Sequence, residues 1–190
     1  MFKVGDKVVY PMHGAGKIES IEERSILDET HQYYIIKMPG EVKVMVQISK
    51  AEENGLRYII DKETAGKVIK VLEEDCTEMS DKWNKRYRDN VEKIKKGDIY
   101  EVADIVRNLV FKQKDKGLSH TEKKMLLNAK QILVSELVLA EDSNKDAMEE
   151  IVDQKINASY EMHVGAPKVE NEVVSTDGIP DNAKVFKVQA

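Results

Sequence analysis

The segment from Ser80 to Lys96, SDKWNKRYRDNVEKIKK, marks where the chain passes from β-type patterning to helical patterning. Ser80 is a favoured residue type for the N-cap of a helix, and Gly97 is a favoured type for its end. Between them the apolar residues recur at intervals that place them on one helix face: Trp83, Tyr87, Val91 and Ile94. The spacing therefore predicts a helix that packs one face against a core.

The only tryptophan of the chain, Trp83, lies among basic residues of this segment, which are Lys82, Lys85, Arg86 and Arg88. Cations can contact phosphates while an indole meets bases or sugars, so the grouping suggests contact with a nucleic acid. The alternative, and commoner, role of such a tryptophan is that of a core anchor. The position of Trp83 in the first helical turn favours exposure of its side chain, since a side chain can project from the end of a helix. The free backbone N–H groups at that end also favour binding of a phosphate.

Residues 1–61, upstream of this helix, carry the pattern of a β domain. Apolar residues alternate with polar ones between Val42 and Ile48, the two-residue period of a half-buried strand. Other short runs rich in β-branched and aromatic residues are separated by turn signals such as Pro39-Gly40. Five short strands in this length predict a small barrel of SH3 or Tudor type.

Residues 62–160 carry helical patterns with short connections, which predicts a compact all-α domain. Ser119 and Glu122 form a capping-box pattern at the start of one helix, and Ser143 can cap the next. The predicted fold class is therefore α+β, with a β-barrel followed by a helical domain.

Helical periodicity stops after Tyr160. Residues 161–190 contain scattered Gly and Pro among polar residues, which predicts a flexible or weakly ordered tail. The valine-containing pieces 173–174 and 185–188 suggest a hairpin within it.

Charge is distributed unevenly along the 190 residues. The net charge of −5 by itself argues against nucleic-acid binding. Residues 79–134 nevertheless carry a net charge of +6, and residues 135–190 carry −7. Because binding depends on the local field, the basic central block is compatible with contact to a nucleic acid.

The sequence contains no phosphate-binding loop, Gly-rich dinucleotide turn, Cys-x-x-Cys or His-Glu-x-x-His motif, so we expect neither enzymatic activity nor a cofactor. His13 and His31 lack the companions of a metal site. The single cysteine, Cys76, can form no internal disulfide and is expected to be inert. No apolar run approaches the roughly 20 residues of a membrane span, so we expect a cytoplasmic protein.

Three blocks carry a family resemblance: FKVGDKVVYPMHGAGKIESIEER at 2–24, WNKRYRDNVEKIKKGD at 83–98 and GLSHTEKKMLLNAKQILVSELVLA at 117–140. In this order they resemble the CarD/CdnL family of bacterial transcription regulators, from about Met1 to about Tyr160. The first block is also similar to the RNA-polymerase-binding domain of transcription-repair coupling factor, a large helicase. This chain has no helicase motif and therefore resembles the stand-alone regulator.

The resemblance implies that the helical domain contacts promoter DNA at the upstream edge of the transcription bubble. In the family, a tryptophan wedges into the distorted minor groove there and slows bubble collapse, and Trp83 falls at that position. Lys85 and Arg88 match basic contacts to the DNA backbone, and Lys123 matches another basic position of the helical domain. Together with Arg86 of the same basic cluster, these residues form the expected DNA-binding set.

The resemblance also implies that the Tudor-like domain binds the β subunit of RNA polymerase. Arg24 matches one polymerase-contacting arginine of the family. Met45 replaces a second one, so an apolar contact from Met45, or the neighbouring Lys43, is expected in its place. Nothing carries over to residues 161–190.

We therefore expect a monomeric transcription regulator that binds RNA polymerase and stabilises the open promoter complex. The alternative is a protein-interaction adaptor, in which Trp83 is buried and the basic helix meets an acidic partner. Neither hypothesis involves a membrane, a metal or a small-molecule substrate.

Overall fold

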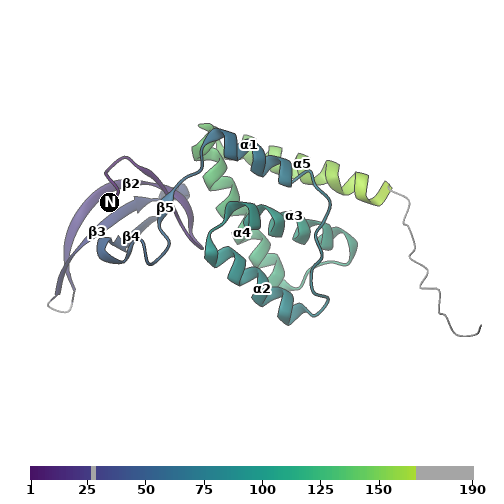
Figure 1. Ribbon diagram of the computed structural model, residues 1–190, viewed down its shortest axis with the longest axis horizontal. Coiled ribbons are helices and arrows are strands. Elements are labelled where there is room, and N and C mark those ends of the chain that lie inside the picture. The colour runs from purple at the N-terminus through teal and green to yellow at the C-terminus, as the bar shows by residue number, and fades with distance from the viewer. Residues whose placement is uncertain (27–28, 166–190) are drawn as a thin grey trace, which may run out of the picture.

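The N-terminal part of the protein is a five-stranded antiparallel sheet with the strand order β4-β3-β2-β1-β5. The computed structural model describes residues 1–26 and 29–165 (Figure 1). The strands are β1 Lys7–Tyr10, β2 Gly14–Ile26, β3 Glu29–Lys37, β4 Lys43–Gln47 and β5 Arg57–Tyr58, with the 3-10 helices η1 Pro39–Glu41 and η2 Ile48–Lys50. The prediction of five short strands is confirmed.

Alternation along the strands sends one set of side chains into a core beneath the sheet. Tyr34 of β3 lies opposite Val46 of β4, and Ile36 lies opposite Ile18 of β2; all four are buried. Met45 points to the other face and is 49% exposed. The half-buried strand predicted around residues 42–48 is therefore confirmed.

Five helices make up the remainder of the described chain: α1 Lys62–Val71, α2 Trp83–Lys96, α3 Ile99–Asp115, α4 His120–Glu141 and α5 Lys145–Gly165. Helix α3 lies at the centre and packs against each of the other four (Figure 1). Its Leu109 and the Leu133 side chain of α4 are fully buried in the helical core. The predicted α+β class, with a compact helical part after the sheet, is confirmed.

The start of α2 differs from the prediction. The helix begins at Trp83, and Lys82 occupies the N-cap position without a side-chain capping bond. Ser80, the predicted cap, stays outside the helix because its carbonyl oxygen accepts a hydrogen bond from the Arg86 guanidinium at 2.5 Å. Gly97 ends the helix in the left-handed conformation, as predicted (φ 74°).

The starts of α4 and α5 test two further capping predictions. The capping box of Ser119 and Glu122 is confirmed, since each side chain accepts a bond from the other residue's backbone N–H. The N–H of Ala147 donates to the side chain of Asn144 at 2.8 Å. Asn144, and not Ser143, therefore caps the first turn of α5.

Helix α5 continues to Gly165, beyond the end predicted at Tyr160. The rings of Tyr160 and His163 pack against Phe111 of α3, with centroid distances of 5.2 and 5.5 Å, and these contacts extend the helix. The rest of the predicted tail, with its suggested hairpin at 173–174 and 185–188, lies outside the described residues. No helix in the described ranges is long and apolar enough to cross a membrane.

A polar network centred on Glu136 of α4 joins the sheet to the helices. Its fully buried carboxylate accepts hydrogen bonds from Arg57 of β5 at 2.6 and 2.9 Å, and from the Ile60 N–H at 3.1 Å. Nearby, Ala15 of β2 donates its N–H to the Ser135 hydroxyl at 2.8 Å. These bonds fix the orientation of the sheet relative to the helical part, because a buried charge left without its partner is costly.

Candidate nucleic-acid and polymerase interfaces

Trp83 lies on the surface at the first position of α2, with 55% of the residue exposed. The later members of the predicted apolar stripe turn inward. Tyr87 and Val91 are partly buried against the helical core, and Ile94 is 2% exposed. Helix α2 therefore buries most of its apolar face while its N-terminal end presents the indole to solvent.

Arg86 holds the start of α2 from inside the protein. The residue is 4% exposed, and its guanidinium donates to the Glu122 carboxylate at 2.5 and 2.8 Å. It also donates to the carbonyl oxygens of Ser80 and Asp81. The expectation that Arg86 contacts DNA is therefore corrected, because its guanidinium faces a buried carboxylate and not solvent.

Glu122 is held in its charged form by its partners. Burial raises the pKa of this carboxyl group, but hydrogen bonds from Arg86 and then from Ser119 lower it by more, so its pKa lies below the usual 4.5. Glu122 is also the capping-box residue of α4. The ion pair thus connects the start of α4 with the start of α2, three positions from Trp83, and fixes where the indole is presented.

Three other cations expected to contact DNA, Lys85, Arg88 and Lys123, are exposed. Within residues 1–26 and 29–165, none of them forms a salt bridge. Lys85 and Arg88 follow Trp83 in the first two turns of α2. Because the N-cap side chain makes no bond, the first backbone N–H groups of α2 are also available to an anion.

The sheet carries the other expected contact residues, Arg24, Lys43 and Met45, on one face. They lie opposite three odd-numbered residues of β3, which are His31, Lys37 and Ile35 respectively. The residues of β3 that point into the sheet core are even-numbered. Since side chains alternate along a strand, these residues share the face that points away from the sheet core. Arg24 of β2 is thus placed on the same surface as Lys43 and Met45 of β4.

This outer face combines an exposed thioether with charged pairs. Lys43 pairs with Glu19 at 2.5 Å, and Arg24 pairs with Glu22. The hydrogen bond from Arg24 lowers the pKa of Glu22. Met45 lies on β4, an edge strand of the sheet. The face therefore offers an exposed apolar side chain at the sheet edge, together with exposed cations, to a protein partner.

Comparison with known proteins places this chain beside two family models and a curated relative. The model of the CarD-like/TRCF RID domain matches residues 2–60, and that of the CarD C-terminal domain matches residues 67–153. A Bacillus subtilis (strain 168) protein described as "Putative transcription factor YdeB" is 42% identical over 138 residues, which is 72% of this chain and 90% of that protein. The chain belongs to the CarD family.

The two CarD-family matches follow the division seen in the structure. The RID match covers the sheet, which confirms the Tudor-like prediction, and the C-terminal match covers residues from within α1 to within α5. RID denotes an RNA-polymerase-interacting domain. This CarD-family protein is therefore a transcription regulator that interacts with RNA polymerase, and its family is one of transcription factors and not of enzymes.

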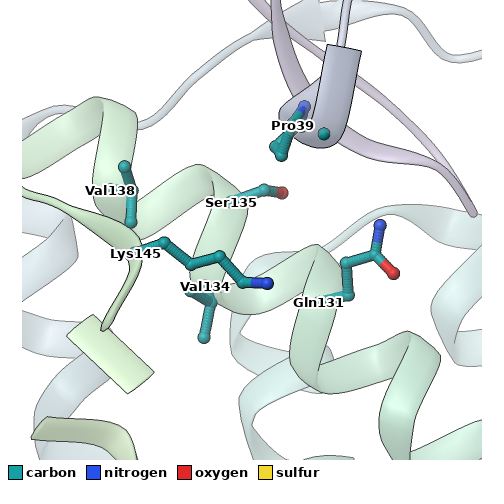
Figure 2. A pocket seen from close by; sticks show the side chains of 7 residues that line it. Pro39, Gln131, Val134, Ser135, Val138 and Lys145 are labelled. Carbon is teal, nitrogen blue, oxygen red and sulfur yellow. The ribbon is translucent and has the colours of Figure 1, made fainter. Parts of the chain in front are cut away.

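A cavity of about 430 Å³ lies between the two parts of this CarD-family protein (Figure 2). It separates the turn at Pro39-Gly40 from α4 and the start of α5. Its lining contains one titratable side chain, Lys145, and no carboxylate or imidazole; the other lining residues are Gln131, Val134, Ser135 and Val138. The cavity therefore lacks the pair of titratable groups needed for general acid–base catalysis.

The spacing of residues in α2 of this CarD-family chain indicates that Arg86 is buried. Arg86, Asn90 and Ile94 follow at intervals of four, which places them on one helix face, and they are 4%, 6% and 2% exposed. The partner, Glu122, lies 36 positions away, so no local pattern predicts the ion pair. The Arg57–Glu136 pair was missed for the same reason.

Proposed function

We propose that this CarD-family protein stabilises the open promoter complex by placing Trp83 in the minor groove at the upstream edge of the transcription bubble. The observation that carries the proposal is the exposed indole at the start of α2, followed by two exposed cations that form no salt bridge within residues 1–26 and 29–165. Lys85 and Arg88 contact the phosphates beside the groove, and Lys123 extends the basic surface on α4. Arg86 acts indirectly, by holding the helix that carries the indole.

A wedge of this kind discriminates between two states of the DNA. Inserting a ring at a base step costs a few kcal/mol of unstacking in an intact duplex. At the edge of a bubble the bases are already distorted, so the ring binds the open state better than the closed one. A preference of about 1.4 kcal/mol shifts the ratio of open to closed complexes tenfold.

Binding to polymerase supplies the proximity that this acidic chain needs. With a net charge of −5 and few proposed phosphate contacts, its affinity for free DNA is expected to be low. Attachment to polymerase turns the DNA contact into an intramolecular step with a high effective concentration. The protein then acts as a monomer, in the cytoplasm, where transcription complexes form.

We propose the outer sheet face of Arg24, Lys43 and Met45 as the surface that binds the β subunit of RNA polymerase. Met45 is 49% exposed on the edge strand of this face, and a methionine can adapt its shape to an apolar partner. The cations beside it steer the encounter with an acidic partner surface.

The deciding experiment measures the lifetime of open complexes with the variant Trp83→Ala. We expect lifetimes to fall toward those without the protein while binding to polymerase stays unchanged, because the sheet face is intact. Tyr100→Ala is the matched control, since Tyr100 is another exposed aromatic residue of the helical part, 37% exposed. Unchanged lifetimes on several promoters would refute the wedge and leave the adaptor function as the alternative. The adaptor hypothesis expected Trp83 to be buried, whereas the residue is exposed.

A further inference from the structure

The connection between α1 and α2 and the last turn of α5 both lie at the end of the helical part that is away from the sheet (Figure 1). Asp75 and Cys76 lie in the connection between α1 and α2, and His163 lies in the last turn of α5. One ligand atom from each residue lies within 4.8 Å of the other two. The sequence predicts no such site, because His163 is 87 positions from Cys76 and falls in the stretch assigned to the tail.

The three residues are held in place by contacts on both sides. His163 Nδ1 lies 2.6 Å from the Asp75 carboxylate, and its ring packs against Phe111 with a centroid distance of 5.5 Å. One turn earlier on α5, the Ser159 hydroxyl donates to the Glu74 carbonyl oxygen at 2.6 Å. The backbone that carries Asp75 and Cys76 is thus fastened to the helix that carries His163.

We infer that Asp75, Cys76 and His163 form a binding site for a zinc ion. A thiolate, an imidazole nitrogen and a carboxylate oxygen are the ligand types that zinc takes, whereas magnesium and calcium take oxygen ligands. Zinc binds sulfur at about 2.3 Å and nitrogen or oxygen at about 2.0–2.2 Å, so at the tetrahedral angle two ligand atoms on one ion lie about 3.4–3.7 Å apart. Reaching this spacing requires rotation of the Asp75 and Cys76 side chains, which are both exposed.

Zinc takes the place of the hydrogen between His163 Nδ1 and the Asp75 carboxylate. That proton and the proton of the Cys76 thiol pass to water. Three protein ligands leave one position of a tetrahedral ion for water. The bound ion ties the end of α5 to the connection that leads into α2. Zinc therefore stabilises the segment immediately before Trp83, without touching the surface proposed to contact DNA.

Zinc titration of the full-length, chelator-treated protein against a chromophoric chelator tests the site. We expect Cys76→Ser and His163→Gln each to weaken zinc binding by at least about tenfold, the loss seen when even an outer partner of a metal ligand is removed. His31→Gln is the matched control, since His31 also lies beside a carboxylate, Glu29 at 3.1 Å, but has no cysteine nearby. Equal zinc affinity in the wild-type protein and the two ligand variants, or an equal loss in the control, would overturn the site.

Three measurements on the unaltered protein remove any dependence on how the variants fold. Cobalt, as a substitute for zinc, should give a near-ultraviolet thiolate-to-metal absorption band, which only Cys76 can supply in this chain. Zinc should also slow alkylation of Cys76 and raise the unfolding temperature, whereas magnesium should do neither. The absence of the cobalt band and of protection would show that Asp75 and His163 form an ion pair only.

Discussion

Trp83 and Arg86 lie three positions apart on α2 and occupy opposite environments. The apolar indole is 55% exposed, while the charged guanidinium is 4% exposed and paired with Glu122. Both placements run against the ordinary preference of the side chain. Exposure of the ring costs little free energy of folding. The buried pair stabilises the fold only as long as both charges are present.

Removing one member of this pair should therefore be far more damaging than removing a neighbouring surface charge. We expect Arg86→Met to lower the free energy of unfolding by about 3–5 kcal/mol, because Glu122 is left as an unpaired buried charge. Arg88→Met, at an exposed position of the same helix, should change it by no more than about 0.5 kcal/mol. Urea unfolding measures both, and the double variant Arg86→Met with Glu122→Met should recover much of the loss. A small loss for Arg86→Met would mean that the pair does not hold α2.

The lowered pKa of Glu122 also predicts how stability depends on pH. A carboxyl group whose pKa is lower in the folded state than in the unfolded state stabilises the fold above its unfolded value, here about 4.5. That contribution disappears as the pH falls through the folded value. The difference in unfolding free energy between wild type and Glu122→Gln should thus be constant near neutral pH and shrink below about pH 4.5. A difference that does not change with pH would contradict the assignment.

The surface proposed for polymerase exists only because three strands lie in register. Arg24 belongs to β2, and Lys43 and Met45 belong to β4, with β3 between them. A shift of β4 by one residue would turn Lys43 and Met45 toward the core. The buried Val46, opposite Tyr34, prevents that shift, so core packing also specifies the contact surface.

Reversing one charge on this face tests the polymerase contact. Arg24→Glu should weaken binding to the isolated β-subunit lobe by about 1–2 kcal/mol at low salt, and the loss should shrink as salt is added. Lys70→Glu provides the same change of charge at an exposed position of α1 and should have little effect. Binding that is insensitive to both Arg24→Glu and salt would exclude Arg24 from the interface.

Periodicity alone predicted most of the strands and helices, because strand alternation and helical stripes are local properties of a sequence. Three helix ends were predicted wrongly. Asn144 and not Ser143 caps α5, and the start of α2 and the end of α5 depend on side-chain contacts that the helical period does not contain. Arg86 takes the carbonyl oxygen of Ser80 and delays the start of α2, and Phe111 extends α5 past Tyr160. Exposure of Trp83 was inferred from its place near a helix start, but the burial of Arg86 required knowledge of Glu122.

In the molecule as a whole, Glu136 determines how the sheet and the helices are placed relative to each other. A regulator that binds polymerase with one part and DNA with the other must present both surfaces at a fixed separation. The network of Glu136, Arg57 and the Ile60 N–H supplies this rigidity from the interior. A second bridge across the same junction, from Lys7 to Asp142 at 2.6 Å, lies in solvent.

These two bridges should contribute very differently to stability. Arg57→Met leaves the fully buried Glu136 without its partner and should cost about 3–5 kcal/mol. Lys7→Met breaks a bridge whose side chains are 37% and 68% exposed and should cost no more than about 1 kcal/mol. Urea unfolding of both variants measures the difference. Equal costs would mean that the junction does not depend on the buried pair.

The single, half-exposed tryptophan gives this protein a built-in optical probe. Because no other indole occurs in the 190 residues, all tryptophan emission reports from the start of α2. Stacking on a base or withdrawal from water changes that emission, so contact of the ring with DNA can be followed without a dye in a mixture of this protein and DNA that contains no other tryptophan.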